Sequence, residues 1–495
     1  MVASFPSFTS SAQVFDWISQ HINFEKVKNR NEFTLDTMKR LAELANYPEK
    51  SAPVIHVAGS KGKGSVAAYI AGILGEAGFT CARYASPHVA DWRERVTAGA
   101  AFFDESIYIE AGDELFSVTE RFMEGTKETA SADAPDAQSD PEAPTFFELM
   151  TLYFFLCARK ARCDVMVVET GMGGRLDATN IVDPLMSVIT LIEKEHTERL
   201  GDTLALIAGE KAGIIKPGRP LALAEQQKEA YDVFVKRAEE KDSRLYYLPN
   251  NARLDHIRLF PNKTSFRLVP ARPHTPLSLS VPTPGVVQAY NAALAALTTT
   301  VAFPHVSREA IAAGLAKTAL ISRFEKICDD PVVIVDGAHT RSSIAACADT
   351  WTTLYGSTAG SGASGVLLFG CAADKDIFAM ASILFPLFSY IIVTRPGTFK
   401  TSFPEKVYAV FAELERTGRR TLRNADKAQA ENIRFEPETQ KAIAQAVSLG
   451  RGKKAPVLAA GSFYLTGDVI AYMKNNWKPT GEQDVYDTVE NRKTN

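Results

Sequence analysis

Several features are scarce in this chain of 495 residues, and each shortage excludes a class of protein. The six cysteines contain no C-x-x-C pair, so we expect buried, reduced thiols instead of disulfides or a zinc site. No stretch approaches the roughly 18 uninterrupted apolar residues of a membrane-spanning helix. The N-terminus lacks the basic region, apolar core and cleavage site of a secretion signal, so we expect a cytoplasmic protein.

Charge of either sign is not in large excess. The formal net charge of −3 gives no electrostatic argument for binding nucleic acid or an anionic membrane, and it favours a small-molecule partner. What the chain does have is an apolar fraction of 46% alongside 23% charged residues, which is typical of a globular protein. Its length exceeds what one hydrophobic core usually serves, so two domains are expected.

Short apolar runs alternate along the chain with longer segments of helical period. These runs predict buried strands at residues 53–58, 164–169, 186–192, 332–335, 366–370, 390–394 and 456–460. Strands that alternate with helices form parallel sheets with crossover helices. The sequence therefore predicts a doubly wound α/β architecture.

The order of these runs also predicts the domain limits. We expect a first domain over residues 1–320, a second over residues 321–476 and a disordered tail over residues 477–495. Two further segments, residues 124–144 and 356–365, are rich in small and polar residues and have little apolar surface to bury. Both are predicted to be surface loops.

The most informative stretch is VIHVAGSKGKGS, residues 54–65, in which an apolar strand enters a glycine-rich turn before a helical run. Glycines allow backbone N–H groups to face an anion, Lys63 can reach the outer phosphates, and Ser65 supplies a hydroxyl suited to Mg²⁺. The pattern departs from G-x-x-x-x-G-K-[ST], because Gly64 separates Lys63 from Ser65. ATP binding is favoured, and an ordinary strand-to-helix turn is the alternative.

Other polar residues follow predicted strands at the carboxyl edge of the sheet, where ligands bind in such folds. Glu169 ends one strand and His196 lies in the loop after the next. Both residue types bind metals, although Glu169 could instead cap the glycine turn and His196 could simply be exposed. Ser86 offers a hydroxyl compatible with Mg²⁺, but a Ser-Pro pair usually just begins a turn.

Taken together, these and other motifs resemble one family. In chain order the motifs are GSKGKGS (59–65), ASPH (85–88), TFFE (145–148), ETGMGGRLDATN (169–180), EHTERLGDT (195–203), EKAGIIKPG (210–218), QAYNAALA (288–295), SRFE (322–325), DGAH (336–339), DKD (374–376) and GSFYLTGD (461–468). They resemble the folylpolyglutamate synthase and dihydrofolate synthase family, within the wider group of muramyl-type amide ligases. The resemblance spans about residues 33–470.

The resemblance implies an N-terminal P-loop ATPase-like domain of the Mur ligase central type and a smaller Rossmann-like C-terminal domain. It implies an ADP-forming ligase, expected to be a monomer, that joins L-glutamate to a folate or dihydropteroate carboxylate through an acyl phosphate. A muramyl-peptide ligase acting on a UDP-linked substrate is the alternative enzyme. A nucleotide-binding module without ligase activity is the alternative of another class.

Site residues follow from the resemblance by position. ATP would be bound by Gly59, Ser60, Lys61, Gly62, Lys63, Gly64, Ser65, Asn291, Arg323, Asp336 and His339. Two Mg²⁺ ions would be held by Ser65, Ser86, Glu169, His196 and Lys211, of which Lys211 would carry a carbamate derived from CO₂. The catalytic residues would be Lys63, Lys211, His196 and Glu169. The pterin-bearing substrate would contact Thr145, Phe146, Phe147, Glu148, Leu176, Asp177 and Ala178.

Without the resemblance, several of these residues have simpler interpretations. Lys211 could be an ordinary lysine on a helix surface, and at least one of Phe146 and Phe147 is expected in the core. Asn291 could be a helix N-cap. Arg323 could form an ion pair in a linker, and Asp336 could begin a turn.

The chain departs from the family pattern at four places. Lys61 replaces an asparagine in the phosphate loop, and Glu195 replaces the aspartate before the metal-binding histidine. Val287 stands where histidine is usual before Gln288, and Thr340 replaces the asparagine after DGAH. These departures leave the predicted metal and ATP set in place and make the substrate preference less secure.

Overall fold

The computed structural model describes most of the chain. The described residues are 7–23, 34–133, 143–271, 275–356, 365–397, 401–421 and 432–476. They form two compact units. The first unit takes the described residues up to 255 together with 267–279 and 290–318, and the second unit takes 256–266, 280–289 and the described residues from 319 onward. The domain limits expected at residues 320 and 476 stay predictions.

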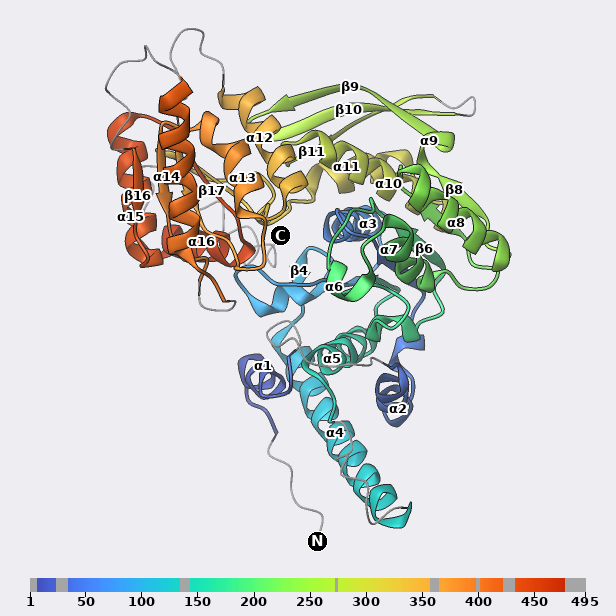
Figure 1. Ribbon diagram of the computed structural model, residues 1–495. Coiled ribbons are helices and arrows are strands. Elements are labelled where there is room, and N and C mark those ends of the chain that lie inside the picture. Colours follow the sequence, from blue (N-terminus) through green and yellow to red (C-terminus); the bar gives the residue numbers. More distant parts are fainter. Residues whose placement is uncertain are drawn as a thin grey trace, which may run out of the picture. The chain divides into compact units, whose positions relative to one another are not determined.

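The first unit is built on an eight-stranded sheet with the order β4-β3-β2-β5-β1-β6-β7-β8, of which Figure 1 labels β4, β6 and β8. Its strands are β1 (Val54–Ala58), β2 (Cys81–Tyr84), β3 (Val96–Ala98), β4 (Ala101–Phe102), β5 (Val165–Glu169), β6 (Met186–Ile189), β7 (Leu221–Leu223) and β8 (Leu245–Tyr247). The six strands from β2 to β8 in this order are parallel, and β3 and β4 add an antiparallel edge. Both β1 and β5 are buried along their whole length, as strands covered on both faces should be.

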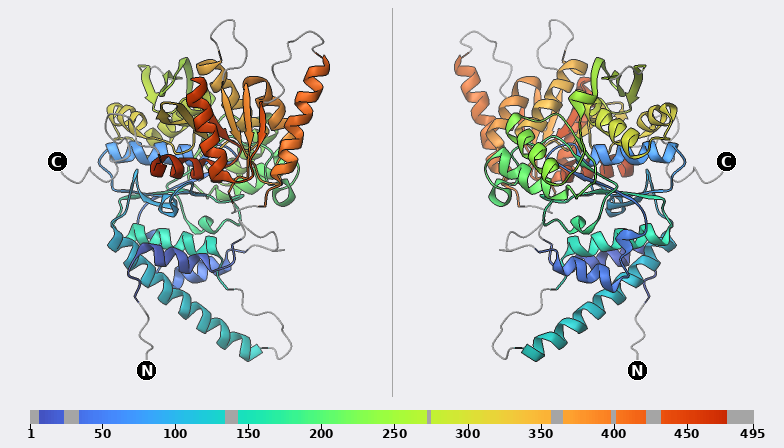
Figure 2. Two further views of the ribbon diagram at one scale, coloured as in Figure 1. Left: turned by 90° about the vertical axis from the view of Figure 1, so that its left-hand side faces the viewer. Right: turned by 90° about the vertical axis from the view of Figure 1, so that its right-hand side faces the viewer.

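Helices cover both faces of this sheet. They are α1 (Ser11–Ser19), α2 (Asp36–Leu44), α3 (Lys63–Glu76), α4 (Glu105–Asp133), α5 (Phe146–Lys160), α6 (Thr197–Leu200), α7 (Leu204–Lys211), α8 (Lys228–Glu240), α9 (Leu248–Asn251), α10 (Val286–Ala302) and α11 (Arg308–Lys317). Figure 2 shows α5 gathered with α1, α2 and α4 on one face, while α3 lies on the other face beside α11. Right-handed crossovers place α3 and α5 on opposite faces, because the chain moves across the sheet in one direction through α3 and in the other direction through α5.

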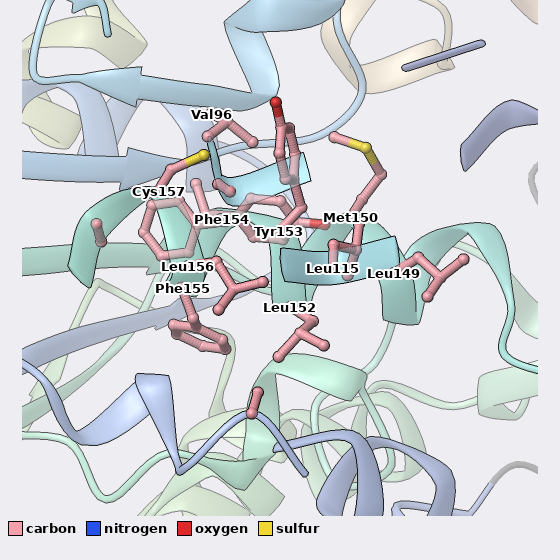
Figure 3. Close-up of a cluster of buried hydrophobic side chains, with 14 of the residues drawn as sticks. Val96, Leu115, Leu149, Met150, Leu152, Tyr153, Phe154, Phe155, Leu156 and Cys157 are labelled. Carbon is pink, nitrogen blue, oxygen red and sulfur yellow. The ribbon is translucent and has the colours of Figure 1, made fainter. Parts of the chain in front are cut away.

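Helix α5 runs through a large cluster of buried side chains in this unit (Figure 3). All of its residues from Glu148 to Ala158 are buried, and they contact Leu115 of α4 and Val96 of β3 within the same cluster. A helix that is apolar on all sides is stable only when other elements surround it. Helix α4, the first two helices and the strands β2 and β3 provide that cover.

The prediction of a surface loop at residues 124–144 is wrong for the first half of that segment. Residues 124–133 belong to α4, which runs unbroken from Glu105 to Asp133. The composition of this stretch allows a helix, because alanine, glutamate and lysine are good helix formers, and Leu115 and Phe122 anchor the preceding turns in the core. The rest of that segment from residue 134 to 142, most of residues 356–365, and the predicted tail lie outside the described residues.

The second unit contains a six-stranded sheet with the order β12-β13-β17-β14-β15-β16. Its strands are β12 (Glu325–Asp329), β13 (Val332–Asp336), β14 (Val366–Phe369), β15 (Tyr390–Val393), β16 (Ile433–Phe435) and β17 (Val457–Ala460). Its helices are α12 (Arg341–Tyr355), α13 (Ile377–Leu384), α14 (Pro404–Thr421), α15 (Thr439–Lys453) and α16 (Phe463–Asn476). All neighbours are parallel except β12 and β13, which gives the predicted Rossmann-like arrangement.

Smaller elements complete the described chain. A three-stranded sheet has the order β11-β10-β9, with β9 (Ala252–Phe260), β10 (Lys263–Pro270) and β11 (Leu277–Val281). The 3₁₀ helices are η1 (Pro48–Lys50), η2 (Trp92–Arg95), η3 (Ala178–Ile181), η4 (Ala212–Ile214) and η5 (Phe385–Leu387). The six cysteines are free thiols, and five of them are buried. Among the described residues, no helix combines the length and the apolarity needed to cross a bilayer.

Candidate functional site

The glycine-rich loop joins the end of β1 to the start of α3. Gly62 adopts a φ of +89°, and a Cβ atom there would lie 2.4 Å from Oδ1 of Asn291, so both the backbone and its surroundings require glycine. Gly62 is also the N-cap of α3, and no side chain in the described chain caps this helix with a hydrogen bond. The first N–H groups of α3 are therefore available to an anion, which is the geometry expected of a phosphate loop.

Two lysine side chains converge on one carbonyl oxygen of this loop. Nζ of Lys63 donates to the Gly59 oxygen at 3.0 Å, and Nζ of Lys211, the last residue of α7, donates to the same oxygen at 2.8 Å. Lys211 also reaches Oε1 of Glu195 at 3.2 Å, and Lys61 lies 3.6 Å from Oε2 of the same carboxylate. The structure thus brings three predicted site lysines together around Glu195.

These charges change the acidity of the groups in the cluster. Burial raises the pKa of Glu195, but the positive charges of Lys63, Lys211 and Lys61 outweigh burial and lower it to about 2. Burial and the charge of Lys63 lower the pKa of Lys211 to about 8, against the opposing effect of Glu195. The side chain of Lys211 is only 1% exposed, so it is not an ordinary surface lysine.

Glu169 occupies the carboxyl end of β5, next to β1 in the sheet. It is 4% exposed and accepts a hydrogen bond from the Ser86 N–H at 3.4 Å. A Cβ atom on Gly64 would lie 3.2 Å from Oε2 of Glu169, so the carboxylate faces the first turn of α3 beside Ser65. The structure therefore brings three of the predicted metal ligands to the mouth of the phosphate loop.

His196 lies in the loop after β6, directly after Glu195 and just before α6. Its backbone is left-handed with a φ of +49°, and its side chain is exposed. Within the described residues, no group of three or more His, Cys, Asp and Glu side chains is arranged to hold a metal ion. Glu169 and the hydroxyls of Ser65 and Ser86 are hard oxygen donors, and they fit Mg²⁺, which binds one or two carboxylates together with substrate phosphates.

The predicted substrate residues at the start of α5 have clear structural roles. Thr145 and Glu148 form a reciprocal capping box, with the Thr145 N–H donating to Glu148 Oε2 at 2.8 Å and the Glu148 N–H donating to Thr145 Oγ1 at 3.2 Å. Phe146 is 2% exposed and belongs to the core. Phe147 is half-buried, and its ring fills the space that a side chain on Gly171 would need.

The second predicted substrate segment is held by Asp177, the N-cap of η3. Its carboxylate accepts hydrogen bonds from the N–H groups of Met172 at 2.9 Å and Thr179 at 3.1 Å. Burial raises the pKa of Asp177, and these hydrogen bonds oppose the rise. Oγ1 of Thr179 also lies 2.9 Å from Nε2 of His56 on β1, so two residues without a predicted role support this loop. Leu176 and Ala178 flank Asp177 in the same turn.

Asn291 does not begin a helix. It lies within α10, which starts at Val286, so its interpretation as a helix N-cap is wrong. Its side chain instead occupies the space beside Gly62. This contact joins residues that are far apart in the sequence and places Asn291 at the phosphate loop.

The second unit brings together the remaining predicted nucleotide residues. The guanidinium of Arg323 lies 4.4 Å from the centre of the Phe463 ring, and the ring of His339 lies 5.5 Å from the same centre. Asp336 accepts hydrogen bonds from the N–H groups of Phe324 at 2.9 Å and Ala338 at 2.7 Å. Burial raises the pKa of Asp336 to about 6, and the charge of Arg323 opposes the rise.

Comparison with known proteins identifies the family of this chain. Residues 117–299 match the Mur ligase middle domain, and residues 322–463 match the glutamate ligase domain of Mur ligases. A Bacillus subtilis (strain 168) protein named dihydrofolate synthase/folylpolyglutamate synthase is 33% identical over 349 residues, which cover 69% of this chain and 76% of the relative. The chain belongs to the dihydrofolate synthase and folylpolyglutamate synthase family.

Solved structures of the family share the fold. The Mycobacterium tuberculosis folylpolyglutamate synthase complexed with ADP and AMPPCP has a TM-score of 0.78 at 24% identity, covering 94% of this chain and 98% of that one. An FPGS–AMPPCP–folate complex has a TM-score of 0.72 at 26% identity, covering 93% of this chain and 98% of that one. The predicted two-domain α/β fold of the Mur ligase type is confirmed.

Proposed function

We propose that this chain is an ATP-dependent ligase that joins L-glutamate to a carboxylate of a folate or dihydropteroate, forming ADP and phosphate. The observation that carries the proposal is the uncapped start of α3, with Lys63 and the carboxylate of Glu169 at the same edge of the sheet. Membership of a family named for glutamate ligation supports it, as do the relatives solved with ATP analogues and folate.

The phosphate loop, Gly59 to Ser65, would hold the phosphates of ATP against the N-terminus of α3. Ser65, Ser86, Glu169 and His196 would hold Mg²⁺, which would neutralise charge on the phosphoryl group and act as a Lewis acid when bound. Arg323, Asp336, His339 and Asn291 remain predicted contacts of the nucleotide. The expected monomer and the cytoplasmic location also stay predictions.

Lys211 is proposed to carry a carbamate that completes a second Mg²⁺ site. Its nearly complete burial and its lowered pKa of about 8 support the proposal, because only a neutral amine adds to CO₂. The addition releases a proton and converts a cation into an oxygen ligand. Carbon-13 NMR after incubation with labelled bicarbonate tests this directly, since the Lys211→Ala variant should lack the carbamate signal.

In the proposed reaction, the carboxylate of the pterin substrate attacks the γ-phosphorus of ATP, and ADP leaves. The glutamate amine then attacks the carbonyl carbon of the acyl phosphate, loses a proton and expels phosphate. Lys63 stabilises the negative charge on the transferred group, so positioning and electrostatics account for most of the rate.

The decisive experiment measures phosphate release by purified protein with Mg-ATP and L-glutamate, comparing dihydropteroate with tetrahydrofolate as acceptor. Release with dihydropteroate alone indicates a dihydrofolate synthase, release with tetrahydrofolate alone a tail-lengthening synthase, and release with both a bifunctional enzyme. No release with either acceptor, together with turnover of a UDP-linked substrate, contradicts the proposal in favour of a muramyl-peptide ligase.

A further inference from the structure

The first half of the phosphate loop is fastened to the segment of residues 191–196, which follows β6. The N–H groups of Ser60 and Lys61 both donate to the Leu191 oxygen, at 2.9 and 3.0 Å. Oγ of Ser60 donates to the Glu193 oxygen at 2.9 Å. These N–H groups are thus already used within the protein, whereas no side chain of a described residue caps the first N–H groups of α3.

Lys61 makes a second link to the same segment through its side chain. Its ammonium lies 3.6 Å from Oε2 of Glu195, and the two side chains are 24% and 13% exposed. Charges that are partly removed from water interact more strongly than exposed pairs on a surface. Both the backbone and the side chain of Lys61 therefore point to residues 191–196 as its partner.

Glu195 divides its two oxygens between two lysines. Oε1 lies 3.2 Å from Nζ of Lys211, while Oε2 lies 3.6 Å from Nζ of Lys61. Loss of Lys61 would leave one oxygen without this partner and would free the carboxylate to turn toward Lys211 or Lys63. The position of Lys211 is coupled to Lys61 in this way, although Lys61 and Lys211 share no direct bond in the cluster.

We propose that Lys61 is a positioning residue that holds Glu195, and through it Lys211 and the segment of His196, instead of binding the phosphates of ATP. Lys61 and Glu195 are also two of the four positions at which the chain departs from the family pattern, and these two departures contact each other. Glu195 replaces a shorter acid and Lys61 replaces an amide, so the two changes together create one ion pair. The expected effect of the Lys61–Glu195 pair on turnover rests on the proposed ligase function.

The test is a double-mutant cycle with the Lys61→Met, Glu195→Gln and combined variants. Lys61→Arg is the conservative variant, and Lys317→Met is the matched control, because Lys317 forms an ion pair with Glu76 at 2.7 Å elsewhere in the first unit. Each protein is measured for ADP affinity by calorimetry, for kcat and the KM of ATP, and for hydrogen exchange of residues 191–196 without ligand. Thermal unfolding verifies that each variant is folded.

We expect Lys61→Met to lower kcat about tenfold while ADP affinity and the KM of ATP change less than about twofold. Hydrogen exchange should become faster at residues 191–196, and Lys61→Met should have no further effect in the Glu195→Gln background. Lys61→Arg should restore most of kcat, and Lys317→Met should change none of these values.

Two results would overturn the inference. One is an ADP affinity that falls tenfold or more in Lys61→Met, with or without Glu195, because this would make Lys61 a phosphate ligand. The other is unchanged exchange at residues 191–196 in Lys61→Met. Since ADP affinity and exchange do not depend on ligation, they also separate failure of this inference from failure of the proposed ligase function.

Discussion

Two junctions between a strand and a helix, one in each unit, begin alike and end differently. Both β1 and β13 have a strand on either side in their sheets, and both lead through a glycine turn into a long helix. The N-terminus of α3 has Gly62 as its cap and no capping side chain, whereas α12 begins with Thr340 and Ser343 in a reciprocal capping box. In α12 a side chain therefore accepts from one of the first N–H groups, that of Ser343, whereas among the described residues no side chain does so at the start of α3.

The carboxylates near the two junctions also differ, because their pKa values are shifted in opposite directions. Glu195, near α3, lies among three lysines, and its pKa is lowered to about 2. Asp336, before α12, is half-buried, and loss of solvent raises its pKa to about 6 against the opposing charge of Arg323. The comparison teaches that a strand, a glycine turn and a helix do not by themselves make a phosphate site. The junction of β1 and α3 differs from the other in its uncapped N–H groups and its surplus of positive charge, which are the features that a phosphate site needs.

The largest expected effect comes from removing the cation at the first junction. Lys63→Ala should lower kcat for ADP formation by about 100-fold or more, because Lys63 is expected to stabilise charge on the transferred phosphoryl group. The Lys326→Ala variant, which breaks the Lys326–Asp329 ion pair in the second unit, should keep full activity. Near-normal turnover of Lys63→Ala in a folded protein would contradict the assignment of residues 59–65 as a phosphate-binding loop.

The next effect tests the shape of the same loop. Gly62→Ala forces a left-handed residue against Asn291, so we expect a loss of about 1–3 kcal/mol in stability and at least tenfold weaker ADP binding. Gly78→Ala is the matched control, because Gly78 has a similar φ of +91° but nothing within 4 Å of the added Cβ. It should lose stability without losing ADP affinity. Equal ADP affinities in the two variants would contradict the close contact.

The features that were predictable from sequence share a physical basis. Strands such as β1, β5 and β17 are buried on both faces, so they appear as continuous apolar runs. The amphipathic strands β9 and β10 were not predicted, because their exposed and buried residues mix with charges. Strands β4 and β16 have only two and three residues, which is too short for any periodic signal.

The residues of the candidate site also differ in how far the sequence alone could predict them. Residues in the glycine loop carry their signal in a local motif, so Gly62 and Lys63 could be named before the structure. Support from His56 to Thr179 joins residues 123 positions apart, and no local pattern reveals it. The contact of Phe463 with Arg323 and His339 depends likewise on the packing of α16. Sequence motifs thus indicated the groups that we expect to face ligands, and the residues that hold these groups in place needed the structure.

The pH dependence of stability sharpens the contrast between the two carboxylates. Because the pKa of Asp336 is about 6 in the folded protein and 3.8 as its ordinary value, the folded state binds more protons between these values. Stability should therefore fall as the pH rises from about 4 to about 6 and should stay reduced above that range. Asp336→Asn removes this pH-dependent cost, which is about 2 kcal/mol at pH 7.5. Its amide offers one acceptor oxygen to the two N–H groups that bind the two oxygens of Asp336, so a loss that does not depend on pH opposes this gain.

Denaturant unfolding at several pH values measures this difference. The stability of Asp336→Asn relative to the wild type should be about 2 kcal/mol higher at pH 7.5 than below pH 4, where the carboxyl group is protonated in both states. Asp349→Asn, at an exposed position on α12, is the control and should leave the curve unchanged. A gain that is equal at pH 4 and pH 7.5 would show that burial of a charge is not its cause.

The smallest expected effect comes from opening the N-terminus of α12. Thr340→Ala removes the hydroxyl that accepts from the Ser343 N–H and should cost about 1 kcal/mol of stability, while Thr340→Ser should retain the cap. The variant frees the Ser343 N–H at the start of α12 but gains no lysines, so titration with inorganic phosphate should show no new binding. Phosphate binding by Thr340→Ala would mean that the cap alone separates the two junctions, and that the lysines around Gly59 are not required.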